Sequence, residues 1–193
     1  MRVGIIGAGN IGATLARRLV EAGYHVAIAN ARGPQTLGDV AIATGARAVS
    51  IEEVASGVDA LVLSIPQRAT PSLRPELFAR APVVIDTNNY YPFRDDRIAA
   101  LDNGLADSVW VTQHVRRPVV KAFNSIQSHS LAQYGRPPWR HRPHRVAAFW
   151  RRCSRDGHFR RACGSGRLSR CCHRQSCVFM APAARLASIL HRP

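Results

Sequence analysis

The stretch that decides the fold is Val3–Gly12, which reads VGIIGAGNIG. Residues 3–6 form a short apolar run typical of a buried parallel strand. The glycine pattern G-x-G-x-x-G then leads into residues 13–22, whose apolar positions recur at helical spacing. A second apolar run, residues 24–29, predicts another strand. Strand, glycine loop, helix and strand in this order are the context in which the pattern indicates a dinucleotide-binding unit.

Each glycine has its own physical task in such a unit. Gly7 permits the tight turn after the strand, Gly9 lets a pyrophosphate approach the backbone, and Gly12 allows the helix to pack closely on the strand. Free N–H groups and partial positive charge at the helix N-terminus favour the phosphates. We therefore expect a dinucleotide at this loop. The alternative is a glycine-rich structural turn in an unrelated α/β protein.

The end of the second strand indicates which dinucleotide binds. Residues 29–34 read ANARGP and contain no carboxylate, whereas NAD sites usually place Asp or Glu there to hold the ribose 2′-OH. Arg32 is placed to pair with a 2′-phosphate, since a guanidinium group binds phosphate oxygens in pairs. The pattern predicts NADP rather than NAD. The alternative is that Arg32 is a solvated loop charge and Asn30 a turn residue.

Strands and helices continue to alternate beyond this unit. Further strands are expected at residues 47–49, 59–66, 82–86 and 118–124, and helices at residues 50–53, 71–78 and 98–105. This alternation predicts a doubly wound parallel α/β sheet of the Rossmann type. Ligands of such sheets bind at the carboxyl ends of the strands, so residues 64–66 should lie beside the cofactor.

Charge divides the chain into two regions. Residues 1–135 contain 13 Lys and Arg residues and 11 Asp and Glu residues, whereas residues 136–193 contain 14 Arg residues and one acid, Asp156. All five cysteines also lie in the second region. The formal charge of +15 for the 193 residues therefore arises mainly in the C-terminal part. We divide the chain into an NADP-binding domain, residues 1–137, and a basic C-terminal tail, residues 138–193.

Five motifs, in order along the first region, carry a family resemblance. They are GAGNIG at residues 7–12, NARGP at 30–34, SIP at 64–66, VIDTNNYY at 84–91 and VKAFN at 120–124. Together they resemble the NADP-dependent coenzyme F420 oxidoreductase family over residues 1–137. The resemblance implies a Rossmann domain with a short C-terminal extension, and hydride transfer between NADPH and the deazaflavin F420.

The resemblance also implies roles for the matched positions. The implied cofactor-binding residues lie in four of these motifs: Gly7, Ala8, Gly9, Asn10, Ile11, Gly12, Asn30, Arg32, Ser64, Ile65, Pro66 and Ala122. Asn88, Asn89 and Tyr90 are expected to shape the deazaflavin pocket; the alternative is a polar turn after the fifth strand. We assign no catalytic acid or base, because hydride transfer between two cofactors depends chiefly on the alignment of their rings.

The C-terminal tail does not resemble the end of this family. Residues 136–145 read RPPWRHRPHR where the family continues with a strand, a helix and a final acidic strand. Arg, Cys, His, Pro and Ser are what a GC-rich gene yields in a wrong reading frame, and codons shifted by one base permit a family-like string, GDIDRIALPLSGDD, from Trp139 onward. We expect a frameshift near Pro137 and Pro138, a disordered tail, and impaired catalysis by this chain.

Two other interpretations of the tail are weaker. The charge of +13 on residues 136–193 would attract nucleic acids, and Trp139, Phe149 and Trp150 could stack on bases, but no nucleic-acid-binding motif accompanies them. The cysteines lack the paired spacing of a zinc site. We therefore expect no specific nucleic-acid partner and no metal.

Compartment, assembly and substrate are less directly indicated. No apolar run approaches the roughly 18 residues needed to cross a bilayer, and the N-terminus has no secretory signal pattern. We expect a cytoplasmic protein with small-molecule partners, and a homodimer is compatible with the sequence. Two other functions stay open: NADP-dependent reduction of another small substrate, and a non-catalytic NADP-binding remnant.

Overall fold

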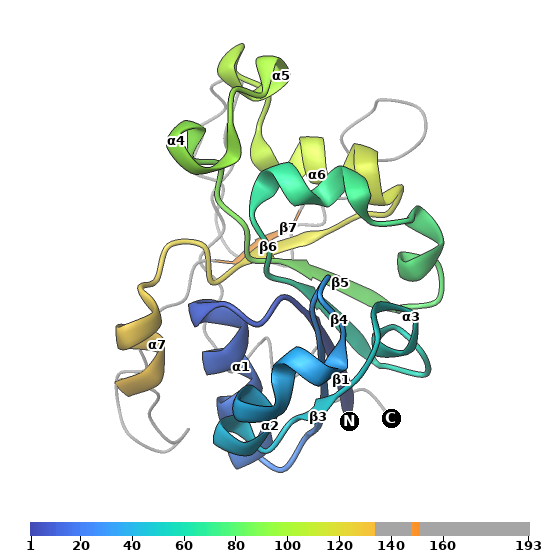
Figure 1. The fold of residues 1–193 in the computed structure, drawn as a ribbon. Helices are drawn as coiled ribbons and strands as arrows, with labels where there is room; N and C mark the ends of the chain where they lie inside the picture. Colours follow the sequence, from blue (N-terminus) through green and yellow to red (C-terminus); the bar gives the residue numbers. More distant parts are fainter. Residues whose placement is uncertain (134–147, 151–193) are drawn as a thin grey trace, which may run out of the picture.

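The computed structural model describes residues 1–133 and 148–150, which form a seven-stranded sheet with the order β3-β2-β1-β4-β5-β6-β7 (Figure 1). The strands are β1 (Arg2–Ile6), β2 (His25–Ala29), β3 (Arg47–Ala48), β4 (Ala60–Leu63), β5 (Val83–Asp86), β6 (Val120–Ala122) and β7 (Ala148–Trp150). The pairings among β1 to β6 are parallel, and β7 runs antiparallel to β6. The order of the six parallel strands is that of the dinucleotide-binding doubly wound fold, so the predicted fold class is confirmed.

Helices and short 3-10 turns cover both faces of this sheet (Figure 1). One face carries α1 (Asn10–Glu21), η1 (Pro34–Leu37), α2 (Gly38–Thr44) and α7 (Ser128–Gln133). The other face carries α3 (Ile51–Val54), η3 (Pro75–Phe78), α5 (Ala99–Asp102) and α6 (Asp107–Val115). η2 (Gln67–Ser72) follows β4, and α4 (Pro92–Asp95) follows β5. The polypeptide segments after these two strands therefore lie at the carboxyl edge of the sheet.

The two apolar cores follow from the two-residue period of the strands. In β4, Ala60 and Val62 face the core that contains Leu15 of α1, whereas Leu61 and Leu63 face the core that contains Val111 of α6. All four β4 residues are buried. A strand that is buried on both faces needs apolar residues at every position, which is why residues 60–63 form a continuous apolar run.

Prolines account for a difference in the predicted helix at residues 71–78. The structure has two 3-10 turns there, η2 and η3, separated by Leu73 and Arg74 in extended conformation. Pro75 disfavours helical backbone at the residue before it, so Arg74 cannot continue a helix. The helix predicted at residues 71–78 is therefore wrong.

The helix α6 was missed in the sequence. Its buried residues Ser108, Val111 and Val115 recur at the spacing of one helix face, a pattern that could have identified it. The predicted helix at residues 98–105 is instead the single turn α5, after which Gly104 adopts a φ of 89°. A left-handed glycine is a common end of a helix, so the chain turns there and α6 begins anew.

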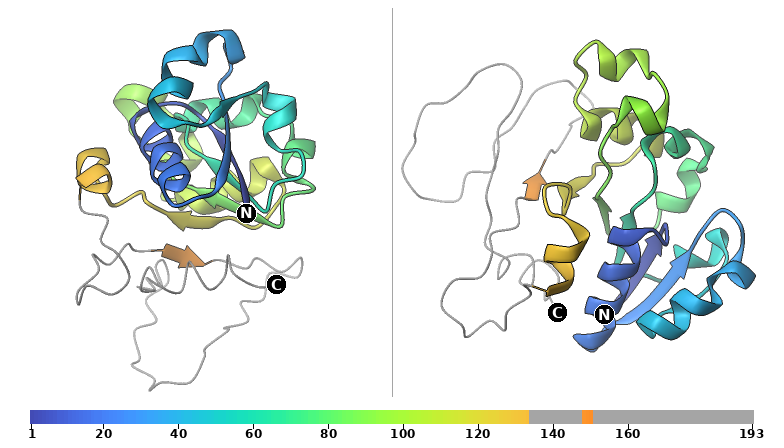
Figure 2. Two further views of the ribbon diagram at one scale, coloured as in Figure 1. Left: turned by 90° about the horizontal axis from the view of Figure 1, so that it is seen from below. Right: turned by 60° about the vertical axis from the view of Figure 1, so that its left-hand side comes forward.

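The predicted boundary at residue 137 is crossed at one place. Residues 148–150, which lie in the C-terminal tail, form β7 beside β6 at the edge of the sheet (Figure 2). These three residues therefore pair with the sheet of the first region. The remainder of the tail, with its arginines and cysteines, lies outside the described residues. No helix in the described part of the chain is both long and apolar enough to cross a membrane.

Gly12 should be essential to the fold, whereas Gly9 should not. A Cβ at Gly12 would lie 2.0 Å from the carbonyl oxygen of Gly7, but a Cβ at Gly9 would meet nothing within 4 Å. We expect Gly12→Ala to lower the free energy of unfolding by at least about 1–3 kcal/mol, because the clash is with backbone. Gly9→Ala, the matched control, should cost less than about 1 kcal/mol. Urea denaturation measures both, and equal stability of the two variants would contradict the described packing.

Candidate functional site

The glycine loop is held against the ends of two neighbouring strands. Gly7 has a φ of 111°, and its N–H donates to the carbonyl oxygen of Ala29 at 2.8 Å. A Cβ at Gly7 would lie 2.0 Å from the carbonyl oxygen of Ser64. The backbone of the loop thus passes between β2 and β4 at a distance that only glycine permits. This geometry agrees with the predicted task of Gly7 and extends it to the contact with Ser64.

The N-terminus of α1 is open to an anion. Gly9 is the N-cap residue, no side chain caps the helix, and no acidic residue lies in its first turn. Since Gly9 and Asn10 are exposed, the N–H groups of the first turn face a region that a ligand can enter. Free N–H groups and the helix dipole together favour a phosphate at such a position. The helix that begins here, α1, is 12 residues long.

The loop after β2 is organised by the side chain of Asn30. Its Oδ1 accepts from the N–H of Arg32 at 2.9 Å, and its Nδ2 donates to Oγ1 of Thr36 at 2.9 Å. The Thr36 hydroxyl in turn donates to the carbonyl oxygen of Gly33 at 2.9 Å. Asn30 therefore organises this loop, and its predicted contact with the cofactor stays a prediction. The Arg32 side chain is exposed at the tip of the loop that Asn30 holds.

Thr36 is a part of this loop that sequence reasoning missed. It lies six positions after Asn30, in the turn η1 that opens with Pro34. A hydroxyl that bonds to a side chain six residues away has no short-range sequence signature, and only the turn at Gly33, whose φ is 91°, brings the two together. The hydroxyl makes the loop more rigid, because it connects both ends of the turn.

Asparagine side chains connect the ends of β4, β5 and β6. The Oδ1 of Asn88 accepts from the N–H of Ile65 at 2.9 Å, and so joins the segment after β5 to the segment after β4. The Nδ2 of Asn89 donates to the carbonyl oxygen of Asn124 at 2.7 Å, and so joins it to the segment after β6. Asn88 is buried and Asn89 is half-buried. These residues form a polar turn, and the turn fixes the edge at which ligands of such sheets bind.

A buried ion pair lies beneath this turn. The Nζ of Lys121 lies 2.9 Å from Oδ2 of Asp86 and also donates to the carbonyl oxygen of Asn88. The other carboxylate oxygen of Asp86 accepts from the N–H of Asn88 at 2.9 Å. Burial raises the pKa of Asp86 above its ordinary value, against the opposing effects of the Lys121 ammonium and the Asn88 N–H. The pair was not assigned a function from the sequence.

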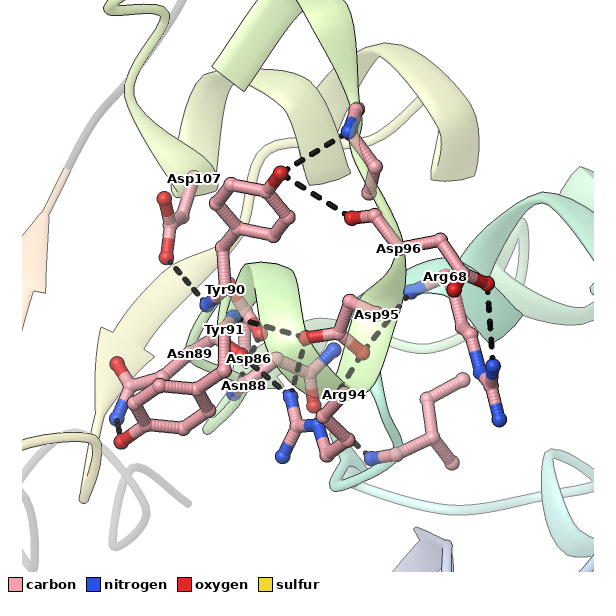
Figure 3. Close-up of polar contacts among 12 residues, drawn as sticks. Arg68, Asp86, Asn88, Asn89, Tyr90, Tyr91, Arg94, Asp95, Asp96 and Asp107 are labelled. Carbon is pink, nitrogen blue, oxygen red and sulfur yellow. Dashed lines mark hydrogen bonds and ion pairs between the residues drawn. The ribbon is translucent and has the colours of Figure 1, made fainter. Parts of the chain in front are cut away.

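Tyr90 points away from this edge. Its ring lies toward the segment that carries Asp96 (Figure 3), and its hydroxyl accepts from the N–H of Ile98 at 3.0 Å and donates to Asp102 at 2.8 Å. Its own N–H donates to Asp107 at 3.0 Å. Burial raises the pKa of Tyr90, and the hydrogen bond from Tyr90 lowers the pKa of Asp102. Tyr90 therefore anchors the segments around α5 and α6.

Asp95 fixes the rim of the site at α4. Its buried carboxylate accepts from Nη2 of Arg94 at 2.7 Å, from the N–H of Tyr91 at 2.9 Å and from the N–H of Arg68 at 3.4 Å (Figure 3). Burial acts to raise the pKa of Asp95, but the hydrogen bonds from these three residues outweigh it and hold the pKa below its ordinary value of 3.8. Arg94 also donates to the carbonyl oxygen of Asn89, so α4 is tied to the asparagine turn.

The structure brings most of the predicted residues to one edge of the sheet. The glycine loop, residues 64–66 and Asn88 follow β1, β4 and β5, and Asn30 and Arg32 follow β2. Ala122 ends β6 at the same edge, but its side chain is fully buried in the apolar core that also contains Ile85. In residues 1–133 and 148–150, no three His, Cys, Asp or Glu side chains gather in a way that could hold a metal ion.

Comparison with known proteins finds a family match in the N-terminal part of the chain. Residues 2–90 match the family model described as NADP oxidoreductase, coenzyme F420-dependent. The resemblance inferred from the sequence motifs is confirmed over this range. The matched segment contains the glycine loop, the Asn30–Thr36 loop, residues 64–66 and the asparagine turn. No curated protein gives a significant match to the chain.

Solved structures with the same fold include proteins of several descriptions. A hypothetical protein, SMa0349, from Sinorhizobium meliloti is 28% identical, with a TM-score of 0.56 over 70% of this chain and 67% of that one. A protein from Arthrobacter sp. FB24, assigned provisionally as an F420-dependent NADP reductase, is 18% identical, with a TM-score of 0.58 over 72% and 69%. A 3-hydroxyisobutyrate dehydrogenase from Mycobacterium tuberculosis is 20% identical, with a TM-score of 0.50 over 68% and 43%. At these identities the last two show the likeness of the fold alone.

Asp95 should make the stability of the rim depend on pH. Its pKa in the folded protein lies below 3.8, so its contribution is present at neutral pH and is lost as the pH falls through the folded value. We expect Asp95→Asn to lower the free energy of unfolding by about 1–3 kcal/mol at neutral pH, and the difference from wild type to shrink below about pH 4. Urea denaturation across pH measures this. The exposed Asp39→Asn is the control, and a pH-independent difference at Asp95 would contradict the pKa shift.

Proposed function

Because residues 2–90 carry the pattern of the coenzyme F420-dependent NADP oxidoreductases, we propose that this chain binds NADPH and transfers hydride between it and a deazaflavin of the F420 type. The observation that carries the proposal is the open N-terminus of α1. There, a Cβ at Gly9 would meet nothing within 4 Å, and no acidic residue lies in the first turn. A dinucleotide pyrophosphate requires this combination of space, free N–H groups and positive potential.

The remaining residues of the edge fit the rest of a dinucleotide. The Asn30 side chain holds the backbone of Arg32, and the exposed guanidinium of Arg32 lies where an adenosine 2′-phosphate would follow the pyrophosphate. Ile65 and Pro66 lie on the other side of the glycine loop, where the ribose and nicotinamide would extend. The Nδ2 of Asn88 is a buried donor without a hydrogen-bond partner among the described residues, and a polar group of a ligand would satisfy it.

The mechanism needs positioning and exclusion of water more than proton transfer. When bound, NADPH supplies a hydride, and the oxidised deazaflavin takes it up together with a proton from water. The residues of this chain contribute by fixing the nicotinamide end through the Ile65–Asn88 hydrogen bond. They also hold α4 at the rim through Asp95. These contacts would keep the nicotinamide and deazaflavin rings at a fixed distance from each other. Such positioning can supply much of the rate enhancement of an enzyme.

Arg32 should select NADPH over NADH. We expect Arg32→Ala to weaken NADPH binding about ten- to hundredfold, because one charge-assisted contact to the 2′-phosphate is lost. NADH binding should stay within about twofold, since NADH has no such phosphate. Nucleotide fluorescence titration measures both affinities.

Arg80→Ala is the matched control for this variant. Arg80 is also exposed, but it precedes β5 and lies at the amino edge of the sheet. Gly9→Ala is a third variant for this comparison, because a methyl group at the glycine loop should weaken the binding of NADPH and of NADH alike. If Arg32→Ala leaves the preference for NADPH unchanged, the assignment of the 2′-phosphate to Arg32 is wrong.

Turnover decides the second substrate. Protein mixed with NADPH and oxidised F420 should bleach the visible absorbance of the deazaflavin. Omission of NADPH or of the protein should abolish the change. NADPH oxidation with an imine or a keto acid, but not with F420, would instead support a reductase of another small substrate. Tight NADPH binding without turnover of any acceptor would support a non-catalytic remnant. The last result would also agree with the predicted effect of the C-terminal tail.

A further inference from the structure

The chain contains one lysine, and it is buried at the carboxyl edge of the sheet. The chain has 27 Lys and Arg residues, and the other 26 are arginines. The Lys121 side chain is 7% exposed, and that of its partner, Asp86, is fully buried. The register of the sheet pairs Lys121 of β6 with Asp86 of β5, so their side chains lie on the same face. Their position is close to the candidate site, yet neither was given a function above.

A buried ion pair is weak grounds for expecting stability. Removal of two charges from water costs about as much as their attraction returns, and apolar pairs of similar volume often replace them without loss. A buried pair at this place therefore calls for another explanation. The geometry supplies one, because Lys121 does more than neutralise Asp86: it also donates to the carbonyl oxygen of Asn88.

The hydrogen bonds of this pair form a connected path to β4. Asp86 accepts from Lys121 through one oxygen and from the N–H of Asn88 through the other. Asn88 is thus held at both its N–H and its carbonyl oxygen, and its side chain is turned toward the segment that follows β4. In that orientation its Oδ1 accepts from the N–H of Ile65. A compact ammonium with three donors can serve both acceptors, whereas a guanidinium presents its donors as a rigid planar fork.

We propose that Lys121 is a positioning residue for the nicotinamide end of the dinucleotide. Its ammonium fixes Asn88, and Asn88 fixes the Ile65–Pro66 segment against which the nicotinamide ribose and ring lie. The inference rests on the proposed function, because it concerns the same cofactor. It assigns the lysine to one half of that cofactor: Lys121 governs the nicotinamide end, and the adenosine 2′-phosphate end is independent of it.

Two ligands separate the two halves. NADPH occupies both ends of the site, whereas 2′,5′-ADP carries the adenosine and its 2′-phosphate without nicotinamide. We expect Lys121→Met to weaken NADPH binding about tenfold or more, because the charge-assisted hydrogen bond that holds Asn88 is lost. The affinity for 2′,5′-ADP should stay within about twofold, because this ligand does not reach the nicotinamide end. Calorimetric titration of both ligands, and the fluorescence of the bound nicotinamide, provide readouts that do not depend on turnover.

Arg117→Met is the matched control. Arg117 lies just before β6, at the opposite end of this strand, and its guanidinium donates to the carbonyl oxygens of Ala79 and Ala81 at 2.8 and 3.0 Å. The substitution removes a cation that bonds to backbone carbonyls, as Lys121→Met does, but at the amino edge of the sheet. It should leave the ratio of the two affinities unchanged even where it lowers stability.

Further variants keep the test decisive. Lys121→Met leaves the Asp86 carboxylate buried without its partner, which is strongly destabilising. If that variant does not fold, the double variant Asp86→Asn/Lys121→Met, which buries no charge, takes its place. It should likewise bind NADPH more weakly and 2′,5′-ADP unchanged. Asn88→Ala should reproduce the selective loss, and its combination with Lys121→Met should be no worse than either alone, since both act through one path.

The outcomes distinguish this inference from the proposed function. A selective loss of NADPH affinity supports it. Equal losses for NADPH and 2′,5′-ADP, or no loss for either, would overturn the role of Lys121 while leaving NADP binding in place. Wild-type protein that binds neither ligand would overturn the proposed function, and the inference with it.

Discussion

The contact between the glycine loop and the end of β4 is the constraint on which the rest of the site depends. Gly7 and Gly12 allow the backbone to pass so close to Ser64, and to itself, that no side chain could be accommodated at either position. This closeness sets the direction in which α1 leaves the sheet. It also leaves Gly9 and the first turn of α1 exposed beside residues 64–66. The N-terminus of α1 and the segment after β4 are therefore parts of one packed unit.

A second feature, the asparagine turn after β5, extends this unit across the sheet. Asn88 reaches the segment after β4, Asn89 reaches the segment after β6, and Lys121 with Asp86 lies beneath them. Buried polar networks whose members are nearly all satisfied specify one arrangement of the groups that form them. The proposed alignment of two rings requires such fixed geometry. The network offers a physical reason why polar residues lie at an edge otherwise built from apolar strands.

Two predictions about individual residues change meaning once the fold is known. Asn30 was expected to contact the 2′-phosphate, yet its side chain organises the loop that presents Arg32. Tyr90 was expected in the deazaflavin pocket, yet its hydroxyl bonds to Ile98 and Asp102 and holds α5 in place. In the structure both side chains bond to neighbouring segments, and their contacts with a ligand stay predictions. The motif identified the right segment, because motifs record which residues occur together and not which atoms face a ligand.

The sequence by itself determined the six parallel strands, the glycine loop and the absence of a carboxylate after β2. These features depend on local sterics and on a two-residue apolar period, both of which are visible in a few consecutive residues. The tertiary structure alone decided that β7 joins the edge of the sheet. It alone brought Lys121 to Asp86 and Asn88 to Ile65, residues 35 and 23 positions apart. Such pairs depend on which strands become neighbours and in what register, and no short stretch of sequence carries that information.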